Sequence, residues 1–124
     1  MKLRNPILVL ILCLLCACTG RANPPSVQRI TAETAYQMMR TSNDFILLDV
    51  RTAQEFQARH IAEAILIPVN ELAERAAREL PDKNALIFVY CQAGRRSADA
   101  ANILAEKGYT QIYDIGGIAN WPFN

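Results

Sequence analysis

The sequence predicts an α/β sandwich in which a mainly parallel five-stranded sheet carries helices on both faces. Short apolar segments alternate along the chain with segments of helical pattern, which is typical of parallel strands joined by helical crossovers. The segments 45–50 and 86–90 are apolar without interruption, as expected of strands that are covered on both faces. About a hundred residues carry this pattern, which is enough for one domain with one core.

The first half of the domain is predicted to hold three strands and two helices. In chain order these are a strand at 27–30, a helix at 31–40, a strand at 45–50, a helix at 52–59 and a strand at 65–67. Thr31 and Thr52 suit the starts of the two helices, because a threonine hydroxyl accepts a hydrogen bond from a free N–H of the first turn. Pro68 ends the third strand, since it has no N–H to donate.

The second half continues the alternation. Its predicted elements are a helix at 71–80, a turn at 81–84, a strand at 86–90, a helix at 97–107, a strand at 111–114 and a short helical turn that ends at 121–122. Asn70 is the expected N-cap of the first of these helices. Gly108 is expected to close the second, because a glycine readily adopts the left-handed conformation found after helices.

Residues 1–22 predict a signal peptide. Lys2 and Arg4 precede an apolar core at 7–17, which is shorter than the roughly 20 residues that span a bilayer. We therefore expect export to the periplasm or cell envelope rather than a transmembrane anchor.

Two cleavage sites compete at the end of this leader. Residues 15–18 (Leu-Cys-Ala-Cys) resemble a bacterial lipobox, with cleavage before Cys18 and a lipid attached to its sulfur. The small residues before Asn23 suit ordinary signal peptidase instead. The lipobox is favoured, because it explains a cysteine at the end of the apolar core. Residues 23–26 then form a short tether before the domain at 27–124.

Composition excludes several classes of function. The formal net charge is +1, and it falls to about −1 without Lys2 and Arg4. The charges are mixed in sign and form no basic block, so nucleic-acid binding has no support. The sequence has neither a cluster of His, Cys and carboxylates with metal-ligand spacing nor a glycine-rich loop of phosphate-binding or dinucleotide form. We expect a monomer without metal or cofactor.

Cys91 is the candidate nucleophile. The other three cysteines lie in the leader, at 13, 16 and 18, so a disulfide framework is excluded from the domain. Cys91 follows an apolar strand and opens a short loop that leads into a helix. Backbone N–H groups in such a loop, together with the helix dipole, stabilise a thiolate and lower the pKa of the thiol. The alternative is that Cys91 is a buried, inert, small apolar residue.

The loop 91–97 (Cys-Gln-Ala-Gly-Arg-Arg-Ser) supplies the other candidate site residues. Gln92 and Ala93 are expected to contribute backbone amides, and Gly94 lets the loop turn so that these amides face inward. Arg95 and Arg96 either attract an anionic substrate or hold the loop in shape and contact solvent. Ser97 is the predicted start of the helix.

Three separated motifs resemble the rhodanese homology domain. They comprise residues 48–51 (Leu-Asp-Val-Arg) with 55–56, 60–61, 64 and 67–69; residues 89–98 with 101; and residues 116–118 with 121. The likeness extends over about 27–123, and the chain looks like an exported, single-domain rhodanese, similar to those of the phage-shock type. One departure is visible: the family's Gly-His-Ile-x-Gly-Ala is replaced by residues 59–64 (Arg-His-Ile-Ala-Glu-Ala), which changes a turn away from the loop.

This resemblance implies sulfur transfer. Cys91 would take the outer sulfur of thiosulfate or a similar small anionic donor as a persulfide, and would pass it to cyanide or another thiophilic acceptor. Cysteine phosphatases need a longer Cys-x5-Arg loop. Here the position of that arginine holds Ser97, so sulfur is favoured over phosphate. The alternative function is a noncatalytic or sulfur-carrier module that docks on an envelope partner.

Asp49 and Arg51 are supporting candidates at the end of the second predicted strand. We interpret them as a structural ion pair near the active edge, in preference to catalytic groups. His60, the one histidine of the chain, is interpreted as structural, because persulfide chemistry needs no histidine base.

Overall fold

The structure is a computed structural model that describes residues 26–124. The predicted leader, its lipid-attachment site Cys18 and most of the tether lie outside the described residues and stay predictions. Within residues 26–124, no helix is both long enough and apolar enough to cross a membrane.

Five parallel strands form one sheet in the order β1-β5-β4-β2-β3. The strands are β1 (Ser26–Arg29), β2 (Ile46–Asp49), β3 (Ile65–Leu66), β4 (Leu86–Cys91) and β5 (Gln111–Gly117). The helices are α1 (Ala32–Thr41), α2 (Ala53–Ala58), α3 (Val69–Glu79), α4 (Arg95–Glu106) and a final 3₁₀ turn, η1 (Ile118–Asn120). The predicted α/β sandwich is confirmed, with every strand pair parallel.

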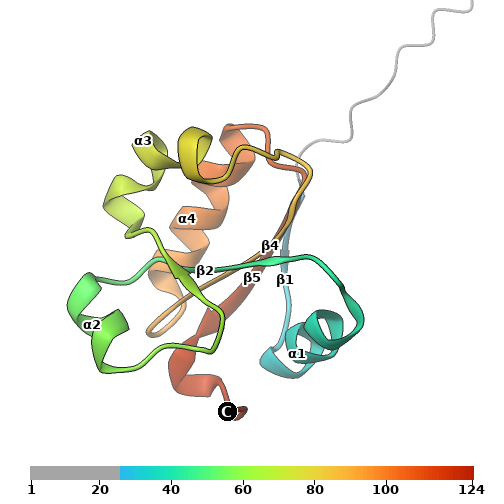
Figure 1. Cartoon of the computed structure of the whole chain (residues 1–124), viewed down its shortest axis with the longest axis vertical. Coiled ribbons are helices and arrows are strands. Elements are labelled where there is room, and N and C mark those ends of the chain that lie inside the picture. The colour runs from blue at the N-terminus through green and yellow to red at the C-terminus, as the bar shows by residue number, and fades with distance from the viewer. Residues whose placement is uncertain (1–25) are drawn as a thin grey trace, which may run out of the picture.

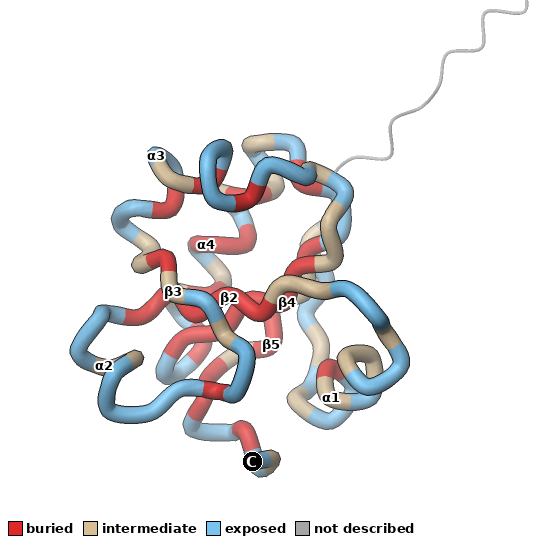
Figure 2. Tube along the Cα trace, viewed as in Figure 1, coloured by how far each residue is buried: buried red, intermediate tan, exposed pale blue. Residues whose placement is uncertain are grey.

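Helices cover both faces of the sheet (Figure 1). On one face, α3 and α4 pack their buried side chains, such as Leu72 and Leu104, against Leu48 and Val89 of the sheet. On the other face, α1 and the C-terminal segment pack against Phe88. The buried residues accordingly gather on the strands and on the inner side of α4 (Figure 2). β4 lies in the middle of the sheet, so its end is surrounded by the rest of the fold.

Three predicted boundaries are wrong. The helix expected from Ser97 begins at Arg95, because Gly94 adopts a left-handed φ of 101° and turns the chain into the helix two residues earlier. Pro68, not Asn70, is the N-cap residue of α3, where a missing N–H costs nothing because the first N–H groups of a helix have no partner within it. β5 continues through Gly117, which pairs with Cys91 beyond a register shift.

The two threonine caps agree with the prediction. The Thr31 hydroxyl accepts a hydrogen bond from the Thr34 N–H at 3.1 Å. Thr52 forms a capping box with Glu55, in which each side chain accepts a hydrogen bond from the backbone N–H of the other residue. The second cap fixes the direction of the Glu55 side chain, which also contacts Arg96.

The turn that departs from the family pattern carries backbone strain. Glu63 has a φ of 70°, and it is the one non-glycine residue with positive φ among residues 26–124. A side chain in this region places its Cβ close to the backbone, at a cost of about 1–2 kcal/mol. The glycine that the family has in this motif would avoid that cost.

We therefore expect Glu63→Gly to raise the free energy of unfolding. Relief of the strain is partly offset by the greater backbone freedom of glycine in the unfolded chain, which leaves a net gain of roughly 0.5–1 kcal/mol. Urea denaturation of the variant and of wild type measures the difference. Glu63→Ala is the control, because it removes the carboxylate but keeps a Cβ in the left-handed region. A glycine variant no more stable than the alanine variant would contradict the account.

Candidate active site

Cys91 lies at the carboxyl end of the central strand β4, where the chain enters the loop that precedes α4. Its side chain is 1% exposed. Gly94, with its left-handed backbone, is the N-cap residue of α4 and brings its N–H to the sulfur, with an N···Sγ distance of 3.0 Å. Strand, loop and helix start therefore stand around the thiol in the arrangement that the sequence predicted.

The surroundings of Cys91 favour its thiolate. Burial raises the pKa of the thiol. Hydrogen bonds from the backbone and hydroxyl of Ser97, and then from the N–H groups of Gly94 and Ala93, lower it. Their sum exceeds the effect of burial, so the pKa of Cys91 lies below its ordinary value. The Ser97 hydroxyl also lies 3.0 Å from the Gly94 carbonyl oxygen, to which it donates.

Gly117 sets the position of the loop from the neighbouring strand β5. A Cβ at this residue would lie 2.8 Å from the Cα of Ala93 and would overlap the carbonyl oxygen of Gln92. The Ala119 N–H lies 3.4 Å from that same oxygen and donates to it. Gly117 is thus a site residue that the sequence analysis did not name as one. The Gly-Gly pair at 116–117, which belongs to the third family-like motif, could have indicated it.

Asp49 and Arg51 form a buried ion pair beside the loop, with exposed fractions of 0% and 3%. Arg51 Nη2 lies 2.7 Å from Asp49 Oδ2, and Nε donates to the same carboxylate. The remaining donors of Arg51 reach the Gln92 side chain at 3.2 Å and the Arg59 carbonyl at 2.6 Å. The pair is fully hydrogen-bonded, and it connects β2 to the active loop.

The two loop arginines have different surroundings. Arg96 makes a bidentate ion pair with Glu55 of α2, with N···O distances of 2.8 and 2.9 Å. The hydrogen bond from Arg96, followed by that from the Thr52 backbone, lowers the pKa of Glu55 to about 2. Arg95 is exposed and has no ion-pair partner within the part of the chain that the structure describes.

Sequence reasoning missed two residues that touch the loop from afar. Glu55 lies 41 positions before Arg96. Arg29, at the end of β1, places Nη2 3.5 Å from the Gly94 carbonyl, 65 positions away. Its Nε also lies 3.6 Å from Asp114. Glu55 occurs in one of the family-like motifs, whereas nothing in the sequence singled out Arg29.

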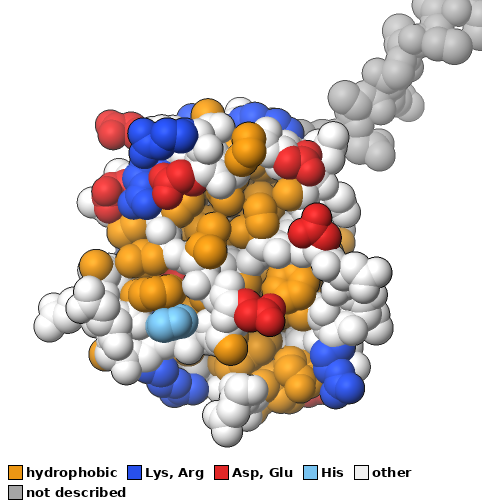
Figure 3. All heavy atoms as spheres, in the orientation of Figure 1, with side chains coloured by type: hydrophobic (Ala, Val, Ile, Leu, Met, Phe, Trp, Pro, Cys, Tyr) orange, Lys and Arg blue, Asp and Glu red, His pale blue; other side chains and the backbone are white. Residues whose placement is uncertain are grey.

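His60 lies outside this arrangement. Its ring stacks on Phe56 with the centroids 3.8 Å apart, and its Nδ1 is 2.8 Å from the Phe56 carbonyl oxygen. The side chain is exposed, and Figure 3 shows it on one face of the molecule, beside apolar side chains. Across residues 26–124, no group of three or more His, Cys, Asp or Glu side chains could hold a metal ion.

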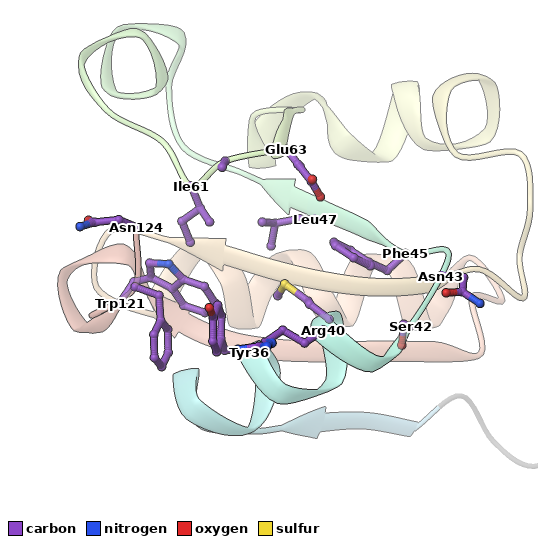
Figure 4. Close-up of a pocket in the computed structure, with 13 residues that line it drawn as sticks. Tyr36, Arg40, Ser42, Asn43, Phe45, Leu47, Ile61, Glu63, Trp121 and Asn124 are labelled. Carbon is purple, nitrogen blue, oxygen red and sulfur yellow. The ribbon is translucent and has the colours of Figure 1, made fainter.

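A separate hollow of about 520 Å³ lies on the α1 face of the sheet (Figure 4). Tyr36 of α1 and Trp121 of the C-terminal segment form one wall, opposite Ile61 and Leu47. The hollow shares no lining residue with the loop 91–97, so it is distinct from the Cys91 site.

Comparisons with known proteins agree with this geometry. A sequence profile described as the rhodanese-like domain matches residues 31–122. The thiosulfate sulfurtransferase PspE of Escherichia coli is 46% identical over 71 residues, which cover 57% of this chain and 68% of PspE. The thiosulfate sulfurtransferase GlpE of Coxiella burnetii is 30% identical over 95 residues, which cover 76% of this chain and 86% of GlpE. The solved structure of a rhodanese with anions from E. coli has a TM-score of 0.60 and 42% identity, and the match covers 64% of this chain and 93% of that one.

The role of the Ser97 hydroxyl can be tested by alkylation. Ser97→Ala should raise the pKa of the Cys91 thiol, because the hydroxyl is among the groups that lower this pKa and the backbone groups that also lower it stay. The rate of reaction with iodoacetamide, measured against pH, should shift to higher pH. Ser42→Ala, a serine outside the loop, is the control. An unshifted profile for Ser97→Ala would mean that the backbone N–H groups alone hold the charge.

Proposed function

Because the chain belongs to the rhodanese family and is a sulfurtransferase, we propose that it transfers the outer sulfur of thiosulfate, or of a similar anionic donor, through a persulfide on Cys91. The acceptor is cyanide or another thiophilic group. The observation that carries this proposal is the environment of Cys91: a buried sulfur with a lowered pKa, held by hydrogen bonds from the loop and the start of α4.

In the first step, the Cys91 thiolate attacks the outer sulfur of thiosulfate. A bond forms between Sγ and this sulfur as the S–S bond of thiosulfate breaks, and sulfite leaves with the electron pair. No proton is transferred in this step, so it needs no histidine base. The outer sulfur of the persulfide carries the negative charge. Backbone N–H groups of the loop are suited to stabilise it, as in an oxyanion hole.

In the second step, cyanide attacks the outer sulfur and forms a C–S bond. The S–S bond of the persulfide breaks, thiocyanate leaves, and the electron pair returns to Cys91 as its thiolate. The two half-reactions share one covalent intermediate, so ping-pong kinetics are expected.

Two further observations support sulfur transfer over phosphate transfer. Two relatives bear the name thiosulfate sulfurtransferase. In addition, the loop holds Ser97 where a cysteine phosphatase needs an arginine, and the Ser97 hydroxyl bonds within the loop, to the Gly94 carbonyl.

Intact-mass spectrometry tests the persulfide directly. Wild-type protein treated with thiosulfate should gain one sulfur atom, which peptide mapping should place on Cys91 and which cyanide should remove. Cys91→Ser should neither gain the sulfur nor turn over thiosulfate, because a hydroxyl forms no persulfide, while its fold should survive this nearly isosteric change. Full activity in Cys91→Ser would refute the proposal. A sulfur that is gained but not released to cyanide would favour the carrier role.

Arg95 is the loop cation expected to attract the donor, because it has no described ion-pair partner. Arg95→Ala should raise the KM for thiosulfate at low ionic strength, by about two- to fivefold, and weaken the dependence of kcat/KM on salt. Steady-state kinetics at several salt concentrations measure both effects. Arg78→Ala, which removes an exposed positive charge from α3, should change neither. Identical kinetics for the two variants would mean that the backbone amides recruit the donor without Arg95.

A further inference from the structure

Helix α2 lies beside the active loop but is weakly attached to the core. It has six residues, and none of them is buried. In Figure 1 it stands out from the end of the sheet, away from α1. Polar contacts connect it and the residue after it to the site: the pair between Glu55 and Arg96, and the hydrogen bond from Arg51 to the Arg59 carbonyl. Glu55 therefore meets the active loop as an ion pair and not through apolar packing.

The Glu55 carboxylate accepts four hydrogen bonds. Its Oε2 accepts hydrogen bonds from the Thr52 N–H at 2.9 Å, the Thr52 hydroxyl at 3.1 Å and Arg96 Nη1 at 2.8 Å. Its Oε1 accepts from Arg96 Nη2 at 2.9 Å. The capping box holds the carboxylate in place independently of Arg96, so Glu55 presents a fixed negative charge to the guanidinium.

Arg96 belongs to the same loop as Cys91. It is the sixth residue of the loop that begins at Cys91, and the Cys91 thiolate is among the groups that raise its pKa, after the hydrogen bond that Arg96 donates to Glu55. Asp49 is the other negative group that acts on it. Because Glu55 offsets the charge of Arg96, Arg95 remains as the uncompensated cation of the loop.

The proposed reaction involves anions at every stage. The donor, the sulfite that leaves and the cyanide that enters are all negative. A strongly positive loop would bind the donor tightly but would also retain sulfite, whereas a neutral loop would recruit neither donor nor acceptor. The net charge around Cys91 therefore affects entry and release together.

We propose that Glu55 is a positioning residue for sulfur transfer, which fixes Arg96 beside the Cys91 loop and offsets its charge so that anionic donors enter while sulfite is released. This inference rests on the proposed function. Glu55 touches neither sulfur nor substrate, and it acts through Arg96.

Glu55→Gln in the full chain tests the inference. Glutamine also completes a capping box, so the change removes the charge and leaves the start of α2 intact. The KM for thiosulfate and the inhibition constant of sulfite should both fall, by about three- to fivefold at low salt, as expected for one more uncompensated charge several ångströms from the substrate. Both differences should shrink at high salt, and kcat should change less than KM.

A second variant separates charge compensation from attachment of α2. Arg96→Gln breaks the same ion pair but removes the positive charge, so it should raise both constants. Opposite directions in the two variants are what the inference requires. If both variants raise KM, the pair only tethers α2, and the inference is overturned.

Glu79→Gln is the matched control. Glu79 also makes a bidentate pair with an arginine, Arg75, on the exposed side of α3. Glu79→Gln should leave the KM for thiosulfate and the inhibition constant of sulfite unchanged. If Glu55→Gln also leaves both constants unchanged, the inference is overturned. Failure of the proposed function would look different: wild-type protein would not turn over thiosulfate, or Cys91→Ser would still do so.

Discussion

The structure depends on one requirement, which is that a buried sulfur must be able to carry negative charge. Burial alone would keep Cys91 protonated. The hydrogen bonds from Ser97, Gly94 and Ala93 reverse that effect, and they are available because the loop turns at Gly94 with a φ of 101°. The loop can lie this close to β5 because Gly117 has no Cβ. Gly94 and Gly117 therefore both help to place the loop that stabilises the Cys91 thiolate.

Arginines from separate elements hold the loop in place. Arg51 pairs with Asp49 in the interior and extends to Gln92. Arg29 contacts the Gly94 carbonyl, and Arg96 joins the loop to Glu55 of α2, both from more exposed positions. The buried pair is the most sensitive of these, because removing one partner would leave an uncompensated charge inside the protein, at a cost of about 3–5 kcal/mol. The exposed contacts are worth less in stability, and their charges contribute instead to the potential around the loop.

The sequence predicted the features that depend on local pattern. Apolar runs and threonine caps gave the order of strands and helices, and Cys91 stood out because a strand, a glycine and a helix surround it. The start of α4 was missed, because Ser97 looks like an N-cap while Gly94 turns the chain through its backbone conformation alone. The contacts of Glu55 and Arg29 with the loop span 41 and 65 positions. Such contacts follow from the strand order, which no local pattern encodes.

The two sides of the site differ in how firmly they are packed. Cys91 and the buried face of α4 belong to the core that α3 and α4 form with the sheet, so the position of the sulfur is set by close packing and resists small changes. The rim is different, because α2 buries no side chain and Arg95 is exposed. Substitutions at the rim can therefore alter which anions reach the sulfur without moving it. In the proposed reaction, the sulfur would react from the packed core, and the charges of α2 and of the loop would select the donor and the acceptor.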